Sequence, residues 1–288
     1  MDTDLPSISP DQLRARLGRA DQPLLLDERR RTRFDDSDAL LPGARYCAPE
    51  DVAAFARRER PRETVVYCTY GHNVSEDAVR TLRGAGWDAR RLQGGLEGGE
   101  PGVDDPARVA AWRAAPLPRM RKRADLRVTG ERPSRWITRA RPKIDRIACP
   151  WLILRFIDPR AEFLYVPAEE VLAQAEALGA VPYDIPGAPI THHWERCSFD
   201  ALLEAFGLAD DPVLRQLATI VRGADTSRPE IAPQSAGLLA LSLGLSRLHD
   251  DDAMLRAALP LYDALHAWCR EGQGETHSWR AHEPVAAA

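Results

Sequence analysis

The sequence has few cysteines and no paired cysteine motif. Its 288 residues contain five cysteines, an odd number, which lie far apart and form no CxxC pair. This pattern excludes a disulfide framework as the basis of the fold and indicates a reducing compartment. A basic segment followed by an apolar one is also missing near the start, so no signal peptide is expected. We therefore expect a cytoplasmic protein.

Long apolar runs are missing as well. The longest apolar stretch, AGLLALSLGL at residues 236–245, is too short to cross a bilayer, so no membrane partner is expected. With 44% hydrophobic and 28% charged residues, the composition is that of an ordinary soluble globular protein, long enough for two domains. The net charge of −4 favours neither a nucleic-acid binder nor an acidic tail.

Residues 1–100 alternate between strand patterns and helix patterns. The apolar runs PLLLDER (23–29) and TVVYC (64–68) are typical of buried strands, whereas PEDVAAFARRE (49–59) and SEDAVRTLRGAG (75–86) are typical of helices. Strands separated by helices predict an α/β domain with a parallel sheet and flanking helices. Ligands of such sheets bind at the carboxyl ends of the strands, where Cys68 is expected.

The composition changes after residue 100. Residues 101–134 are rich in proline and arginine and are expected to form a linker with one short helix, and residues 135–272 predict a helix-rich α+β domain with four short strands. Residues 273–288 show no periodicity and are expected to be a disordered tail. Between residues 119 and 146, eleven bases stand against three acids. Such a run can bind DNA or an anionic ligand, or be a solvated linker; it lacks a helix-turn-helix pattern.

A short loop follows the cysteine of VVYC and precedes a helix expected to begin near Val74–Ser75. Glycine in this loop allows successive backbone N–H groups to converge, and the helix N-terminus adds further donors. We therefore predict an anion-binding loop around the thiolate of Cys68, which would act as the nucleophile. The alternative is that Cys68 is a buried strand residue without chemical role. The predicted loop consists of Thr69, Tyr70, Gly71, His72, Asn73 and Val74.

Four motifs in residues 5–100 resemble the rhodanese (sulfurtransferase) domain: LLLDERR, LLPGA, VVYCTYGHNVSEDAVRTLRGAGW and RLQGGLEGG. The resemblance implies a persulfide on Cys68 and a supporting aspartate and arginine, which map onto Asp27 and onto Arg29 or Arg30. Many active members of the family have arginines in the cysteine loop that hold thiosulfate, and this loop has none. Gly98-Gly99 also replaces the aromatic residue usual after the Gly-Gly turn.

Several polar residues of the second region are candidate ligands. On a strand, the adjacent His192 and His193 would point to opposite faces, so at most one of them would face a given pocket. Asp145, one of these histidines and Asp225 could together hold a metal ion, although their spacing matches no known ligand motif. A metal ion in this region is the only cofactor that the sequence suggests.

Residues 135–270 resemble the C-terminal domain of ChrB-type chromate-resistance proteins. The resemblance rests on long motifs in order, among them KIDRIACPWLILRFIDPRAEFLYVP (143–167) and DIPGAPITHHWERCSFDALLEAF (184–206). It implies a role in chromate resistance or sensing. Because chromate is a tetrahedral oxyanion, the expected contacts are Arg139, Arg146 and either His192 or His193.

These observations lead to one hypothesis with two alternatives. The hypothesis is a rhodanese-type sulfurtransferase module fused to a domain that senses chromate and binds an oxyanion or a metal. Its expected partners are a small sulfur donor such as thiosulfate, or chromate. The first alternative is an anion sensor without catalysis. The second is a transcriptional regulator of chromate resistance, although the DNA-binding region that precedes the shared domain in such regulators is here replaced by the rhodanese-like domain.

Overall fold

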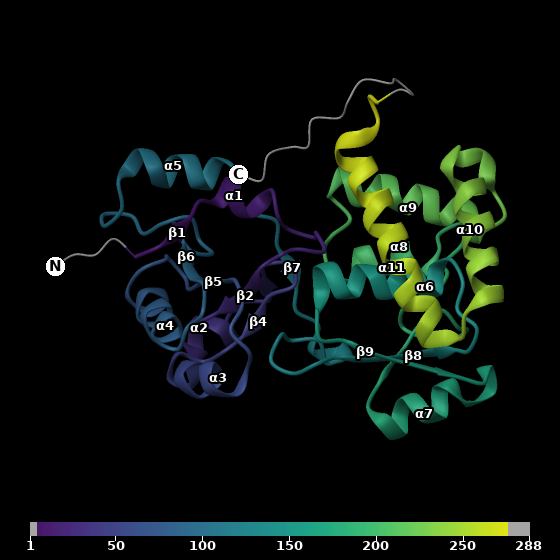
Figure 1. The fold of residues 1–288 in the computed structure, drawn as a ribbon, viewed down its shortest axis with the longest axis horizontal. Helices are drawn as coiled ribbons and strands as arrows, with labels where there is room; N and C mark the ends of the chain where they lie inside the picture. The colour runs from purple at the N-terminus through teal and green to yellow at the C-terminus, as the bar shows by residue number, and fades with distance from the viewer. Residues whose placement is uncertain (1–4, 276–288) are drawn as a thin grey trace.

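Two lobes lie side by side in the computed structural model, which describes residues 5–275 (Figure 1). The N-terminal lobe is built on a five-stranded sheet, and the C-terminal lobe on a smaller sheet covered by helices. Most of the predicted disordered tail, residues 276–288, lies outside the described residues.

The sheet of the N-terminal lobe is entirely parallel, with the strand order β1-β6-β5-β2-β4. The parallel sheet confirms the predicted α/β class. Its strand order places β5, which ends just before Cys68, at the centre of the sheet. The strands are β1 (Ser7–Ile8), β6 (Ala89–Leu92), β5 (Thr64–Tyr67), β2 (Leu24–Asp27) and β4 (Arg45–Tyr46).

Alternating side chains of the central strands build two cores, one on each face of this sheet. Leu25 and Val65 face α1 (Pro10–Arg14), whereas Leu26 and Val66 pack with α3 (Val52–Arg58) and α4 (Asn73–Gly84). The short helix α1 is fixed at its start by a capping box between Ser9 and Gln12.

Residues 101–134 are ordered along the side of the N-terminal lobe and between the lobes. They contain α5 (Pro106–Ala114), the short strand β7 (Met120–Arg121) and a 3-10 helix at residues 124–126. Strand β7 pairs antiparallel with β3 (Ala39–Leu40), which follows α2 (Arg31–Asp35). The interlobe segment is therefore attached to the first lobe by backbone hydrogen bonds.

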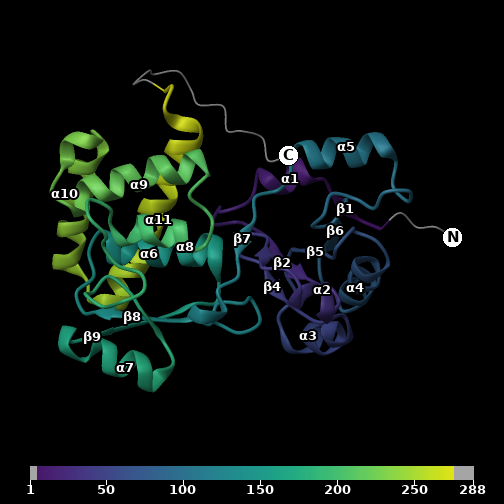
Figure 2. The same ribbon diagram turned by 180° about the vertical axis from the view of Figure 1, so that it is seen from behind.

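The sheet of the C-terminal lobe has three parallel strands in the order β10-β8-β9. In both views α7 lies on one side of this sheet and the other helices lie on the opposite side (Figures 1 and 2). Trp136 of β8 faces the large helical core and its neighbour Ile137 faces α7. The strands are β10 (Val181–Pro182), β8 (Arg135–Arg139) and β9 (Glu162–Val166), and the helices are α6 (Asp145–Leu152), α7 (Val171–Leu178), α8 (Ser198–Ala205), α9 (Pro212–Asp225), α10 (Gln234–Leu248) and α11 (Asp251–Ala267).

One of the four strands expected in this lobe, around residues 188–194, does not form. Only single bridges join Tyr183 to Ile190 and His193 to Arg196. The backbone turns back at residues 193–196, where His193 and Arg196 exchange two hydrogen bonds and Trp194 has a φ of 58°. A chain that reverses here cannot continue as a strand.

The largest core cluster spans both lobes. It joins Phe34, Leu40 and Tyr46 of the first lobe to Met120 of the interlobe segment and to Trp136 of the second lobe, all nine-tenths buried or more. The backbone of the two lobes is also in contact, because the Gly43 N–H donates to the Phe156 carbonyl over 2.7 Å. No helix in the part of the chain described is long and apolar enough to span a membrane.

Candidate functional site

Cys68 is the first residue after β5 and lies over the start of α4. The Gly71 N–H donates to its Sγ over 3.3 Å, and the Ser75 Oγ is 3.4 Å from the same sulfur. The helix begins at Asn73, slightly earlier than expected. Ser75 therefore lies in the first turn, where its hydroxyl donates to the His72 carbonyl over 2.9 Å.

The backbone N–H groups around Cys68 are largely unpaired. Five residues of the predicted loop have N–H groups without a protein acceptor among residues 5–275. Unpaired amides at the N-terminus of a twelve-residue helix are donors that stabilise a nearby negative charge. The loop can therefore stabilise an anionic sulfur at Cys68. The five residues are Thr69, Tyr70, His72, Asn73 and Val74.

Two glycines allow this loop to close against the turn that follows β6. Gly71 has a φ of +84°, and a Cβ there would lie 2.7 Å from the Leu92 carbonyl oxygen. A Cβ on Gly95 would lie 2.6 Å from the Cys68 carbonyl oxygen, which instead accepts the Leu96 N–H over 2.9 Å. The Gly-Gly turn thus holds the cysteine loop by its backbone.

The charged side chains that contact this loop belong to other segments of the chain. The His72 Nε2 is 2.9 Å from the Asp104 Oδ2 and 4.0 Å from a Glu100 oxygen. Arg91 of β6 donates to the Gly71 carbonyl over 3.0 Å. Sequence reasoning missed Asp104, which lies 30 residues beyond the loop and outside the quoted motifs. It also missed Arg91, which begins the motif RLQGGLEGG but lies 17 residues beyond the loop.

The expected supporting pair lies at the carboxyl end of β2. Arg29, rather than the exposed Arg30, binds the Asp27 carboxylate with distances of 2.6–3.0 Å, and both side chains are buried. The Tyr67 hydroxyl also donates to Asp27 over 3.1 Å. Neighbouring Glu28 is fully buried without a hydrogen-bond partner in the described part of the chain, and burial raises its pKa to about 9.

In the C-terminal lobe, three aspartates from separate elements surround one imidazole nitrogen. The His192 Nε2 lies 3.1 Å from Asp184, 3.1 Å from Asp225 and 3.5 Å from Asp145. Asp145 begins α6, Asp225 ends α9, and Asp184 follows β10. The structure thus brings together Asp145, His192 and Asp225, which the sequence singled out, and adds Asp184. His193 lies outside this group, with its ring against Trp194.

Backbone N–H groups and a hydroxyl at the start of α8 donate hydrogen bonds to two carboxylates of this group. The Asp145 carboxylate accepts the N–H groups of Ser198 and Phe199, at 2.6 and 2.9 Å. The Ser198 hydroxyl donates to Asp184 over 2.9 Å. Asp145 is fully buried, and burial raises its pKa. Contacts with the three carboxylates raise the pKa of His192.

Asp184 was missed because its sequence context, YDIPG, is that of an ordinary turn. Its φ of 55° is a left-handed conformation that a non-glycine residue rarely adopts. It lies two residues beyond β10, at the carboxyl end of a parallel strand where ligands of such sheets bind, but this position alone does not show that its side chain turns inward.

Next to this group lies a strongly basic cavity of about 530 Å³. Arg146 connects the two features, because its Nε lies 3.2 Å from Asp184, and Arg139 lies 3.8 Å from the same carboxylate. Among residues 5–275, Lys143 and Arg247 have no carboxylate partner within ion-pair distance. The cavity is lined by Arg139, Ala140, Arg141, Lys143, Arg146, Leu243, Ser246 and Arg247.

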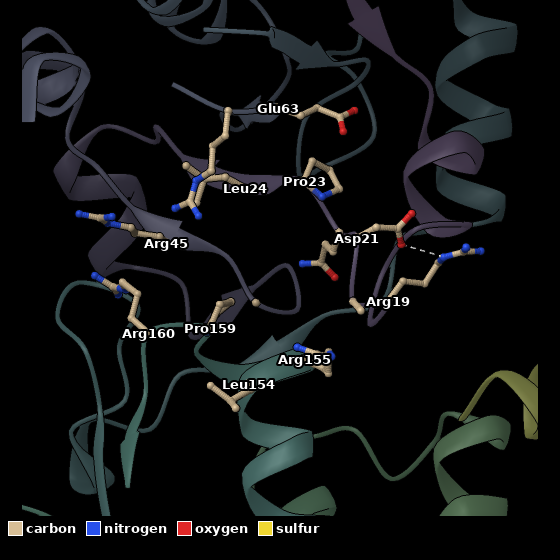
Figure 3. Close-up of a pocket in the computed structure, with 14 residues that line it drawn as sticks. Arg19, Asp21, Pro23, Leu24, Arg45, Glu63, Leu154, Arg155, Pro159 and Arg160 are labelled. Atoms are coloured by element: carbon tan, nitrogen blue, oxygen red, sulfur yellow. Dashed lines mark hydrogen bonds and ion pairs between the residues drawn. The ribbon is translucent and has the colours of Figure 1, made fainter. Parts of the chain in front are cut away.

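A second cavity, of about 300 Å³, lies between the lobes (Figure 3). Leu24 and Glu63 place it at the amino ends of β2 and β5, away from Cys68. Arg45 and Arg160 line it, and Arg155 binds Asp263 with two hydrogen bonds of 2.8 Å. The cavity therefore belongs to the interlobe contact and not to either candidate site.

The cations of the interlobe segment are engaged in contacts with both lobes. Arg119 donates to the Leu96 carbonyl, Lys122 lies over the Phe34 ring, and Arg123 donates to the Ala205 carbonyl. These three residues of the basic run thus stabilise the lobe arrangement.

Comparison with known protein families matches each lobe. Residues 9–100 match the family model of the rhodanese-like domain, and residues 136–269 match that of the ChrB C-terminal domain. Protein ChrB of Cupriavidus metallidurans is 39% identical over 132 residues, which are 46% of this chain and 39% of that protein. The chain thus aligns with well under half of this relative's length.

The solved structures that the chain resembles cover only part of it, with low TM-scores. A rhodanese homolog from the bacterium Thermus thermophilus is 26% identical, with a TM-score of 0.27, and covers 32% of this chain and 98% of its own. A thiosulfate sulfurtransferase from Pseudomonas aeruginosa is 22% identical, with a TM-score of 0.29, and covers 41% of this chain and 20% of its own. Together with the parallel sheet, the family matches show that this chain joins a rhodanese-like domain to a ChrB C-terminal domain.

Proposed function

We propose that the N-terminal domain is a sulfurtransferase in which Cys68 carries sulfur as a persulfide. The observation that carries this proposal is the position of Cys68 Sγ, which accepts the Gly71 N–H at the start of α4 amid unpaired amides. Amides and a helix N-terminus stabilise a thiolate, which is the nucleophilic form of cysteine. They would stabilise a persulfide anion at the same place.

The reaction has two displacements. The Cys68 thiolate attacks the outer sulfur of a sulfane donor such as thiosulfate; a new S–S bond forms, and the old S–S bond breaks with its electron pair leaving on sulfite. An acceptor nucleophile, for example a thiolate, then attacks the outer persulfide sulfur, and Cys68 leaves as a thiolate. Because the loop has no arginine and its His72 is paired with Asp104, we expect dianionic thiosulfate to react more slowly than a less charged donor.

Mass spectrometry of the full chain tests this proposal. After incubation with thiosulfate or with glutathione persulfide, the peptide that contains Cys68 should be heavier by about 32 Da. The Cys68→Ser variant should lose the modification, whereas the Cys269→Ser variant, which lacks a buried cysteine of the other lobe, should keep it. An unmodified Cys68 with both donors would refute the proposal.

A second function is favoured by the basic cavity of the C-terminal lobe. We propose that this cavity binds a tetrahedral oxyanion, with chromate as the candidate implied by the resemblance of residues 135–270 to chromate-resistance proteins. Five cationic side chains and no carboxylate line a space large enough for such an ion. Ile144 and Arg141 in the loop beside it have positive φ values of 40° and 58°, a strain that is common at binding sites.

Equilibrium dialysis with radiolabelled chromate tests the cavity. Replacing Lys143 and Arg247 together by alanine should weaken binding by at least about tenfold, since two charge-assisted contacts are lost. Arg256→Ala removes an exposed arginine of α11 outside the cavity and serves as the matched control. Equal affinity in all three proteins would exclude this cavity, and binding of promoter DNA with a steep salt dependence would instead support a regulator.

A further inference from the structure

The group formed by Asp145, Asp184, His192 and Asp225 contains more acceptors than its single imidazole N–H can serve. An imidazole nitrogen carries at most one hydrogen. Yet three carboxylates lie 3.1, 3.1 and 3.5 Å from the His192 Nε2. Hydrogen bonding by His192 therefore accounts for one of these contacts and leaves two carboxylates facing a nitrogen that cannot donate to them.

The spacing of these atoms is that of ligands around a shared cation. Cation–ligand bonds of about 2.1 Å place neighbouring ligand atoms roughly 3.0 Å apart in an octahedron and roughly 3.4 Å apart in a tetrahedron. The three distances to Nε2 fall close to these values. One ligand atom each from Asp145, His192 and Asp225 also lies within 4.8 Å of the others.

The carboxylates are oriented by groups outside the cluster, as in built metal sites. The two α8 amides hold Asp145, and the Ser198 hydroxyl and Arg146 hold Asp184. Such contacts fix ligand direction. The oxygens that face the His192 Nε2, Asp145 Oδ2 and Asp184 Oδ1, each accept one of these hydrogen bonds and keep a second lone pair for a cation. Asp225 has no protein partner other than His192 among residues 5–275, so its carboxylate depends on the cluster alone.

Charge balance also fits a divalent cation. Three carboxylates bring three negative charges, and Arg146, at 3.2 Å, neutralises one of them. The remaining two charges match a divalent ion bound by a neutral imidazole. The alternative is a protonated His192 that acts only as a counter-ion, with Arg139 at 3.8 Å supplying the last charge. The His192 side chain is 40% exposed, so an ion can reach the cluster from solvent.

We propose that Asp145, Asp184, His192 and Asp225, brought together from α6, the segment after β10, the turn before α8 and the end of α9, bind one divalent first-row metal ion. Three hard oxygen ligands and one imidazole nitrogen suit Mn²⁺ and do not exclude Zn²⁺. The site is distinct from Cys68 and from the basic cavity, with which it shares only the flanking Arg139 and Arg146. It therefore does not depend on either proposed function.

Titration of the metal-free full chain with Mn²⁺, followed by electron paramagnetic resonance of the free ion, tests this site. We expect one Mn²⁺ per chain. The variants Asp225→Asn and His192→Gln should bind it at least about tenfold more weakly, because each loses a ligand. His193→Gln is the matched control, since the neighbouring histidine lies outside the cluster, and it should bind like the wild type.

The change in Tm on addition of Mn²⁺ separates loss of metal binding from a general loss of stability in a variant. Bound metal stabilises the folded chain, so saturating Mn²⁺ should raise the Tm of the wild type and of His193→Gln by similar amounts and raise that of Asp225→Asn by less. Zn²⁺ binding with the same dependence on His192 and Asp225 also supports the site. The counter-ion alternative replaces the proposal if neither metal binds, or if His193→Gln weakens binding as much as His192→Gln.

Discussion

The groups nearest to Cys68 are mostly backbone groups, and glycines allow them to approach it closely. The sulfur accepts an amide hydrogen bond from Gly71, and the turn at Gly95 approaches the Cys68 carbonyl more closely than any side chain would allow. Charged side chains are attached to this loop from β6 and from the segment after the Gly-Gly turn. The chemistry of the loop is therefore sensitive to changes of the backbone.

Replacement of Gly71 by alanine should damage this loop. The residue has a φ of +84°, and the new Cβ would lie 2.7 Å from one backbone atom and 2.8 Å from another. We expect a loss of roughly 2 kcal/mol or more in the free energy of unfolding. Urea denaturation measures it, with Gly84→Ala of α4 as the control; nothing lies within 4 Å of a Cβ there, so that variant should be neutral or slightly stabilised. Equal effects in both variants would contradict this account of the loop.

Buried Glu28 should make the protein less stable as the pH rises. Burial raises its pKa from the ordinary 4.5 to about 9. Between these values the unfolded chain releases a proton that the folded chain retains, so stability is full below pH 4.5 and falls toward pH 9. Between pH 4.5 and pH 9, the free energy of unfolding of the wild type should fall by about 1.4 kcal/mol per pH unit relative to that of Glu28→Gln. Urea denaturation from pH 5 to 8 measures the difference, and parallel pH curves for the two proteins would contradict it.

Residue type was enough to identify several members of the candidate sites, but not their surroundings. Cys68, Asp145, His192 and Asp225 were singled out because their side chains can act as a nucleophile or as metal ligands. Asp184 was missed, since nothing in a strand-turn pattern shows which carboxylate turns inward. Contacts between residues far apart in the sequence, such as that between Asp145 and Ser198, depend on packing that one sequence does not reveal.

At the scale of elements, helix α8 shows how distant groups complete a helix end. The cap residue of this helix is Cys197, and Ser198 is the first helical residue. The orphan N–H groups of Ser198 and Phe199 are satisfied by Asp145 of α6. A cap supplied by a residue 53 positions away cannot be found by local sequence rules. Periodicity nevertheless predicted the main helices and the parallel strands, because apolar faces repeat locally.

Helix α11 contains a histidine that should make the protein sensitive to acid. His266 is buried against Trp151 and Phe156, and burial lowers its pKa from the ordinary 6.5 to about 4. The folded chain therefore keeps His266 neutral, and stability is lost as the pH falls from 6.5 toward 4.

Replacing His266 by leucine should remove this acid sensitivity. As the pH falls from 6.5 to 4, the free energy of unfolding should decrease in both proteins. The decrease in the variant should be smaller than in the wild type by up to about 1.4 kcal/mol per pH unit. Thermal or urea denaturation measures the difference. His249→Leu, at the exposed C-terminal end of α10, should retain the wild-type slope. If the His266→Leu and wild-type curves stay parallel, His266 is not the titrating group.

At the scale of the whole molecule, the sequence predicted two structural units but not the hydrophobic core that they share. Proline and arginine between residues 101 and 134 suggested a linker, and the structure places Met120 of that segment in the core that also contains Phe34 and Trp136. Composition cannot show this, because a buried methionine among exposed arginines looks like part of a solvated segment. The rhodanese-like domain and the ChrB C-terminal domain thus share apolar surface.

A shared core should make the two domains unfold together. Met120→Ala removes a side chain between the domains, and Met254→Ala removes an equally buried one of α11. Each should lose roughly 2–5 kcal/mol of stability, because a buried methionine side chain leaves a cavity. Calorimetry should then show a single transition in the wild type and in both variants, shifted to lower temperature in both, since every part of the chain depends on the same core. Domains that were merely tethered would give two transitions, of which Met254→Ala would shift only one.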